Sequence, residues 1–119
     1  MQVTSFNVNL TSDQPEELVR FYREVVGLPQ NAEMGEGAFE VAGSHLLINR
    51  HSETHGPVKE PQRVLINFFV EDLASEQQRI EGQGVTFIRS AGQEPWGGVI
   101  STFPDPDGNY CQLIEFKPE

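Results

Sequence analysis

The chain has 119 residues, enough for one domain with a hydrophobic core. Its 18 acidic residues outnumber its eight basic ones, which form no cluster, and the formal net charge is −10. Nucleic acid is not an expected partner, because its binding rests on neutralised phosphates. The charge favours a neutral or cationic ligand, although it also serves solubility alone. No run of about 18 apolar residues is present, so no membrane partner is expected.

Two features of the chain bear on its location. The first ten residues, MQVTSFNVNL, lack the basic start and the apolar stretch of a signal peptide. The one cysteine, Cys111, cannot form a disulfide within the chain. Both features fit the reducing cytoplasm, which is the expected location.

The first half of the chain is predicted to form a strand, a helix and three more strands. Apolar and polar residues alternate through 3–10, as in a strand with one covered face. Asp13 lies where a helix N-cap is expected, and Gly27 lies where the helix should end. The further strands are expected at 29–37, as a poor edge strand, at 38–41 and at 45–51.

The same order of elements repeats in the second half. Residues 64–70 alternate, Asp72 is a second N-cap, and Gly82 or Gly84 ends the helix. Further strands are expected at 85–89, 95–103 and 110–116. The polar stretch between the halves holds two prolines and is typical of a linker. We expect one domain over 1–119, made of a first module at 1–51, a linker at 52–62 and a second module at 63–119.

Duplicated βαβββ modules predict an α+β protein. Its curved mixed sheets would surround a cavity, with helices on the outer face. The sequence DPDG at 105–108 predicts a tight turn before the last strand, with Gly108 at positive φ.

The marks of this pattern resemble the vicinal oxygen chelate superfamily. This group includes glyoxalase I, fosfomycin-resistance enzymes, extradiol dioxygenases and bleomycin-resistance proteins. The marks are, in order along the whole chain, FY at 21–22 with GL at 27–28, VEDL at 70–73, and DPDGN at 105–109. The sequence EPWG at 94–97 is similar to the bleomycin-resistance branch in particular.

The resemblance implies a divalent metal held by His, Gln or Glu from the first and last strand of each half. Carried over by distance from the motifs, these positions are Asn7 (or Phe6), Leu47, Leu65 and Gln112. Leucine cannot bind a metal, and two amides will not hold a divalent ion against water. We therefore predict no metal and no cofactor at the family site.

Other polar side chains leave alternatives open. A metal site from His45, His51 and Glu53 is conceivable, although the two histidines would lie roughly 20 Å apart along an extended strand. A general acid or base is conceivable in His51, Tyr110 or Glu94, but the spacing gives none of them a partner. His55 in the linker has no assigned role.

The strand faces opposite the apolar ones are expected to line the cavity. Amides donate and accept hydrogen bonds without charge, and with aromatic surface they suit an uncharged polar ligand. The alternative is that the amides bond to each other, to water or to a partner chain. The predicted ligand-binding residues are Asn7, Asn9, Leu47, Asn49, Leu65, Asn67, Phe69, Trp96, Tyr110 and Gln112.

These observations together predict a protein that binds a small polar or cationic molecule in a dimeric cavity without metal. A metal-dependent or metal-free lyase, isomerase or dioxygenase of the same superfamily is the alternative, and a dimeric module without a small ligand is a third. The resemblance implies a homodimer, because relatives of this length usually form dimers. Trp96 is expected at or near the cavity mouth.

Overall fold

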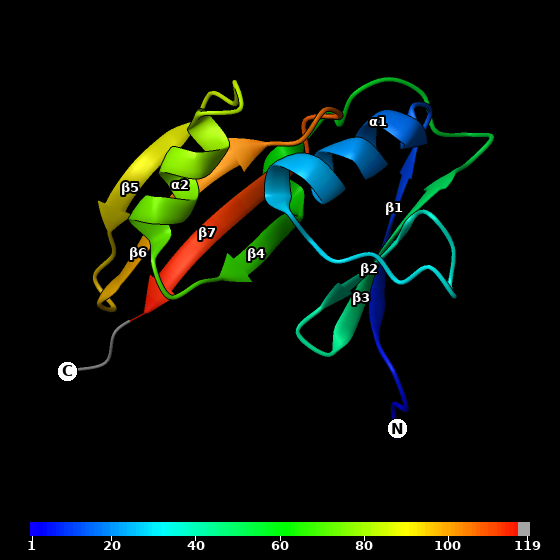
Figure 1. The fold of residues 1–119 in the computed structure, drawn as a ribbon, viewed down its shortest axis with the longest axis horizontal. Helices are drawn as coiled ribbons and strands as arrows, with labels where there is room; N and C mark the ends of the chain where they lie inside the picture. The colour runs from blue at the N-terminus through cyan, green and yellow to red at the C-terminus, as the bar shows by residue number, and fades with distance from the viewer. Residues whose placement is uncertain (117–119) are drawn as a thin grey trace. The chain divides into compact units, whose positions relative to one another are not determined.

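The computed structural model describes residues 1–116 and separates the chain into two compact units. The N-terminal unit is Met1–Gly56, and the C-terminal unit begins at Pro57. Each unit holds one mixed β-sheet with a helix on one of its faces (Figure 1). The architecture is therefore α+β and fits the predicted βαβββ modules. Within residues 1–116, no helix is long and apolar enough to cross a membrane.

The N-terminal unit has a three-stranded sheet in the order β1-β3-β2. Strand β1 runs parallel to β3, and β2 runs antiparallel to β3. Its elements are β1 (Asn7–Ser12), α1 (Pro15–Arg20), the π-helical η1 (Phe21–Val26), β2 (Ala38–Val41) and β3 (Ser44–Arg50).

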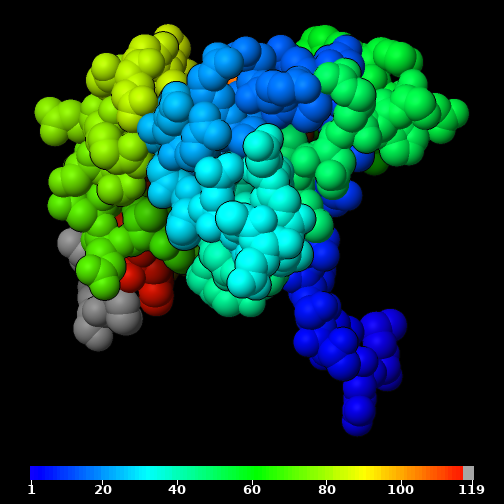
Figure 2. Space-filling view, turned by 45° about the vertical axis from the view of Figure 1, so that its right-hand side comes forward, coloured from blue at the N-terminus to red at the C-terminus, as the bar shows by residue number. Residues whose placement is uncertain are grey.

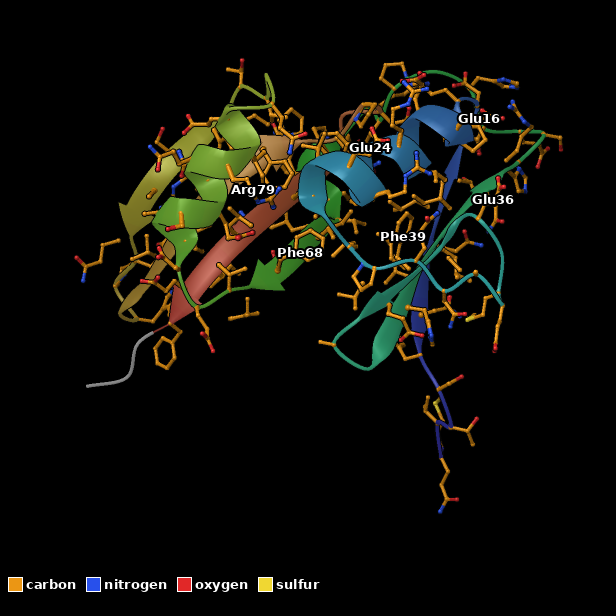
Figure 3. The ribbon with its side chains drawn as sticks, viewed as in Figure 1. Glu16, Glu24, Glu36, Phe39, Phe68 and Arg79 are labelled. Atoms are coloured by element: carbon orange, nitrogen blue, oxygen red, sulfur yellow. The ribbon has the colours of Figure 1, made fainter. Side chains whose placement is uncertain are left out.

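The core of the N-terminal unit lies between the helix and the sheet. Leu18 on α1 and Tyr22 on η1 are fully buried. Phe39 on β2, labelled in Figure 3, is fully buried as well. The rings of Tyr22 and Phe39 lie 6.5 Å apart, and Phe21 meets Tyr22 edge-on at 5.5 Å. As predicted, the helix ends at Gly27, whose φ of +85° is left-handed.

The start of the chain differs from the sequence prediction in two ways. Strand β1 begins at Asn7 and ends at Ser12, so the predicted strand at 3–10 was placed too early. The predicted cap at Asp13 was wrong, because the buried Ser12 hydroxyl accepts from the Gln14 N–H at 2.9 Å before the helix starts. The Asp13 carboxylate instead accepts from the Gly56 N–H at 2.8 Å and ties down the end of the unit.

The predicted edge strand at 29–37 does not form. Gln30 makes one isolated antiparallel bridge to Phe39, and the chain then turns. Gly35, at a φ of +126°, adopts a conformation that no strand continues. The sheet of the first module therefore has three strands, with β2 as predicted and β3 one residue earlier than predicted.

The C-terminal unit has a four-stranded sheet in the order β4-β7-β6-β5. Strand β4 runs parallel to β7, and the other neighbours run antiparallel. Its elements are the short 3₁₀ helix η2 (Pro61–Arg63), β4 (Leu65–Phe69), α2 (Leu73–Glu81), β5 (Arg89–Gln93), β6 (Gly98–Pro104) and β7 (Tyr110–Phe116).

Helix α2 follows the prediction closely. The Asp72 carboxylate accepts from the Ser75 N–H at 3.1 Å, which caps the helix, and Gly82 is the C-cap. The helix buries Leu73 and Ile80 against the sheet. On β7 the side chain of Cys111 is fully buried on the helix-facing side, as the alternation predicted.

Strand β5 was predicted too early, at 85–89, because Val85 and its neighbours favour strands. The observed strand, Arg89–Gln93, is instead selected by its pairing with β6, and a register shift lies between Arg89 and Gly92. Strand β6 begins at Gly98 rather than at residue 95 and ends at Pro104. Strand β7 has the predicted bounds.

The turn before β7 is closed by one buried carboxylate. Asp105 Oδ1 accepts from the N–H groups of Asp107 and Asn109, each at 2.9 Å. Gly108 donates its N–H to the Asp105 carbonyl at 2.9 Å and has a φ of +86°, so the predicted left-handed glycine is confirmed.

Candidate functional site

Each sheet has a face that the helix of its own unit leaves uncovered, which we call the open face. In the N-terminal unit, Asn7 and Asn9 on β1 are exposed, whereas Ser12 is buried on the helix side. On β3, Leu46 and Ile48 are buried on the helix side, and Leu47 between them points to the open face. The open faces carry the predicted ligand-binding residues.

Strand register brings the polar residues of β1 and β3 together. Asn7 pairs with His45, and Asn9 pairs with Leu47. The Asn49 side chain donates to Asn9 Oδ1 at 2.8 Å, so two of the predicted amides bond to each other. Asn7, Asn9, Leu47 and Asn49 therefore share one face of the N-terminal unit.

A second polar group on this face was missed by the sequence reasoning. Glu40 on β2 pairs in register with His45, and Glu40 Oε1 lies 3.1 Å from His45 Nε2. The Asn31 amide donates to the same oxygen at 2.7 Å. A carboxylate held from one side fixes the orientation of the imidazole on the other. The turn at Gly43 fixes this pairing, so the hairpin register is the signal that would have revealed it.

The open face of the C-terminal unit combines amides with exposed apolar side chains. Leu65, Asn67 and Phe69 on β4 pair with alternate residues of β7, among them Tyr110 and Gln112. The Gln112 amide donates to Thr102 Oγ1 on β6 at 3.2 Å, which leaves its carbonyl oxygen for another donor. Phe69 is 71% exposed, an unusual state for a phenyl ring on a sheet.

Trp96 lies at the end of this open face. Its ring covers Gly98, where any Cβ would collide with it, and stands 5.8 Å from the ring of Phe116. Half of its surface is exposed. Arg89 and Glu94 form an ion pair at 2.6 Å nearby on β5 and its loop, and sequence spacing gave no sign of the pair.

Residues 5–113 match the sequence model of the Glyoxalase/Bleomycin resistance protein/Dioxygenase superfamily. The chain belongs to this superfamily. The match spans both units, so the resemblance drawn from the three sequence marks is confirmed. A comparison with curated proteins gave no match.

Solved structures of other superfamily members share the fold at low sequence identity. A protein of Bacillus anthracis assigned to the glyoxalase family is 19% identical over 98% of both chains, with a TM-score of 0.74. The lactoylglutathione lyase of Agrobacterium tumefaciens is also 19% identical, over 97% of this chain and 96% of its own, with a TM-score of 0.72. A superfamily member from Sphaerobacter thermophilus is 22% identical over 97% of both chains, with a TM-score of 0.68.

The metal chemistry of the superfamily does not fit the residues on the open faces. The positions carried over from the family motifs hold Leu47 and Leu65, which offer only hydrocarbon, and two neutral amides. The amide of Gln112 is bonded to Thr102. Within residues 1–116, no group of three His, Cys, Asp or Glu side chains is arranged to hold a metal ion. We derive no reaction step through a metal.

The remaining histidines lie outside both open faces. His51 follows the end of β3, and its Nδ1 accepts from the Glu53 N–H at 3.1 Å, which closes a local turn. His51 therefore lies beyond the strand that carries His45. His55 lies in the loop that ends the N-terminal unit.

Proposed function

We propose that this superfamily member binds a small polar or cationic molecule on its open faces and does so without a metal ion. The observation that carries the proposal is the chemistry of these faces. They present neutral amides and exposed rings, with leucines at two positions that would have to supply metal ligands.

Amides and rings together recognise a ligand by shape and by paired hydrogen bonds. Asn67 and Gln112 pair in register, so their side chains leave the sheet side by side and can each donate and accept. Phe69 and Trp96 offer aromatic surface on the same unit. Aromatic faces attract cations, and the net charge of −10 favours their approach.

The exposed apolar side chains also support the homodimer that the resemblance implies. Leu65, Phe69 and Phe116 are 43%, 71% and 50% exposed, and such surface in one unit is typical of an interaction site. We expect a dimer mass by light scattering at micromolar concentration. The buried single cysteine suits the cytoplasm, which stays our expected location.

Metal content and ligand titration test the proposal together. Protein purified without a tag should contain divalent metal far below one ion per chain by elemental analysis. Trp96, the only tryptophan, should change its emission when uncharged or cationic aromatic compounds are added. The variant Asn67→Leu should weaken this response, and the exposed helix variant Gln78→Leu is the control. An equimolar metal that is lost in Gln112→Leu, or responses equal in both variants, would overturn the proposal.

A metal-free lyase or isomerase is the second candidate function, favoured by the pair formed by Glu40 and His45. A carboxylate that orients an imidazole is a common arrangement in general acid–base catalysis. In this case His45→Gln should abolish turnover of a bound compound while its binding persists. If the unchanged protein binds a compound without turning it over, the catalytic candidate is rejected and only the binding function remains.

A further inference from the structure

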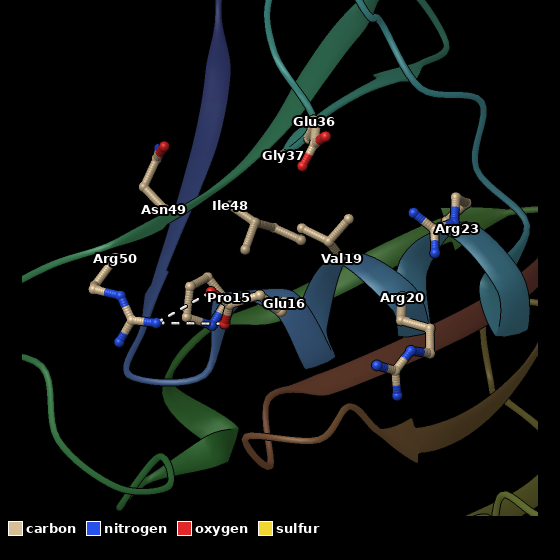
Figure 4. Close-up of a pocket in the computed structure, with 10 residues that line it drawn as sticks. All are labelled: Pro15, Glu16, Val19, Arg20, Arg23, Glu36, Gly37, Ile48, Asn49 and Arg50. Atoms are coloured by element: carbon tan, nitrogen blue, oxygen red, sulfur yellow. Dashed lines mark hydrogen bonds and ion pairs between the residues drawn. The ribbon is translucent and has the colours of Figure 1, made fainter.

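A separate cavity of about 420 Å³ opens on the helix side of the N-terminal unit (Figure 4). It lies between α1 with the start of η1, the segment before β2, and the end of β3. Val19 and Ile48 provide its apolar floor. Three of the eight basic residues of the chain line it, namely Arg20, Arg23 and Arg50. The cavity shares only Asn49 with the predicted ligand-binding residues.

Glu36 is held at the cavity by its backbone rather than by its side chain. The Gln30 amide donates to the Glu36 carbonyl at 2.8 Å, and the next carbonyl, of Gly37, accepts from the Ile48 N–H at 2.7 Å. A Cβ on Gly37 would collide with the Ile48 carbonyl, so only glycine allows this close approach. In the space-filling view the residues before β2, in cyan, lie against the blue residues of the helix (Figure 2).

The charged groups around the cavity differ in how firmly they are paired. The Arg50 guanidinium binds both Glu16 oxygens, at 3.2 and 3.4 Å, and the Asp13 carbonyl at 2.9 Å, which closes one end. The backbone N–H at Glu16 and the Arg50 guanidinium hold the pKa of the Glu16 carboxyl below its ordinary value of 4.5. This end therefore carries an ion pair in which Arg50 makes three hydrogen bonds, with the side chains of Arg50 and Glu16 59% and 73% exposed.

The opposite end keeps exchangeable charges. Arg20 pairs with Glu17 at 3.1 Å and Arg23 pairs with Glu24 at 3.2 Å, with all four side chains 43–56% exposed. Such exposed pairs contribute little and are given up easily for a better partner. Within residues 1–116, the Glu36 carboxylate makes no ion pair or side-chain hydrogen bond.

We propose that this cavity binds a compact zwitterion, an α-amino acid with a branched apolar side chain. Figure 4 shows the Glu36 carboxylate above Val19, with the guanidiniums of Arg20 and Arg23 below it and to its right. The ligand carboxylate pairs with Arg23, since guanidinium matches a carboxylate with two parallel hydrogen bonds. The ligand ammonium pairs with Glu36, and the apolar side chain rests on Val19 and Ile48.

Methyl NMR of the full chain tests this inference with three matched probes. L-leucine carries both charges, 4-methylpentanoate carries only the carboxylate, and 3-methylbutylamine carries only the ammonium. Leucine should shift the methyl signals of Val19 and Ile48 saturably, with half-saturation at about 1 mM. Each single-charge probe should bind about tenfold more weakly. No saturable shift with leucine, or equal binding of either single-charge probe, would overturn the proposal.

Variants separate the cavity from general charge effects. Arg23→Gln and Glu36→Gln should each weaken leucine binding by about tenfold. Arg79→Gln is the matched control, because Arg79 forms a similarly exposed pair with Glu76 at 3.1 Å on α2 and does not line the cavity. All three positions are exposed, so folding should persist. If all three variants bind leucine as tightly as the unchanged protein, the assignment is contradicted. It is also contradicted if all three lose affinity equally. Because no residue of the open-face proposal is changed, the two proposals fail independently.

Discussion

Replacing Gly108 by alanine should destabilise the C-terminal unit through backbone conformation alone. Gly108 has a φ of +86°, and a Cβ built there would meet no atom within 4 Å. No steric clash therefore adds to the cost of a left-handed residue, about 1–2 kcal/mol. Alanine also restricts the unfolded chain, which stabilises the folded state by roughly 0.4–1 kcal/mol. The free energy of unfolding should therefore fall by about 1 kcal/mol, which lowers Tm by about 4 °C for a chain of this size.

Gly82→Ala is the matched control for this experiment. Gly82 is also a glycine at the end of an element, but its φ of −63° suits any residue. Its Cβ would lie 3.3 Å from the Arg79 carbonyl oxygen, an approach that a small backbone shift relieves. Urea unfolding of both variants should show a loss for Gly108→Ala and little change for Gly82→Ala. Equal shifts for the two variants would refute the argument from φ.

Two further predictions concern carboxylates. Asp105 is 5% exposed and accepts hydrogen bonds from two backbone N–H groups at 2.9 Å and from the Asn109 amide at 2.8 Å. Asp105→Ala should therefore lower the free energy of unfolding in urea by about 3 kcal/mol. A loss no larger than that of Gly108→Ala would contradict this. The lowered pKa of Glu16 stabilises the fold above its ordinary value of 4.5 and not below its folded value. The stability difference between the unchanged protein and Glu16→Gln should therefore be present at pH 6 and shrink as pH falls below 4.5. A difference that grows on acidification would show the opposite sign.

The sequence predicted best those features that one or two residues decide locally. Asp72 caps α2 through its own side chain, and Gly27 and Gly108 adopt the positive φ that their turns require. The alternation in β4 likewise placed Leu65 and Phe69 on one face, because strand geometry alone sets that period.

Features that depend on distant partners could not be predicted from the sequence. Aspartate is a preferred residue at a helix N-cap. The Asp13 carboxylate instead accepts a hydrogen bond from the Gly56 N–H, 43 residues away. Strand β5 forms where β6 offers partners, although Gly92 is a poor strand residue. On the open faces, residue identity gave the predicted amides, but the pairing of Glu40 with His45 required the hairpin register. The cavity at Glu36 depends on the close approach of Gly37 to Ile48, which no spacing rule reveals.

The complete burial of Cys111 makes its thiol a probe for local opening of the C-terminal unit. The thiol lies on the side of β7 that faces α2, so a thiol reagent can reach it only when helix and sheet separate. Because the chain has no second cysteine, modification by a thiol reagent reports on this position alone. Under conditions where closing outpaces modification, the labelling rate reports the fraction of molecules in which helix and sheet are separated, and therefore the free energy of that opening.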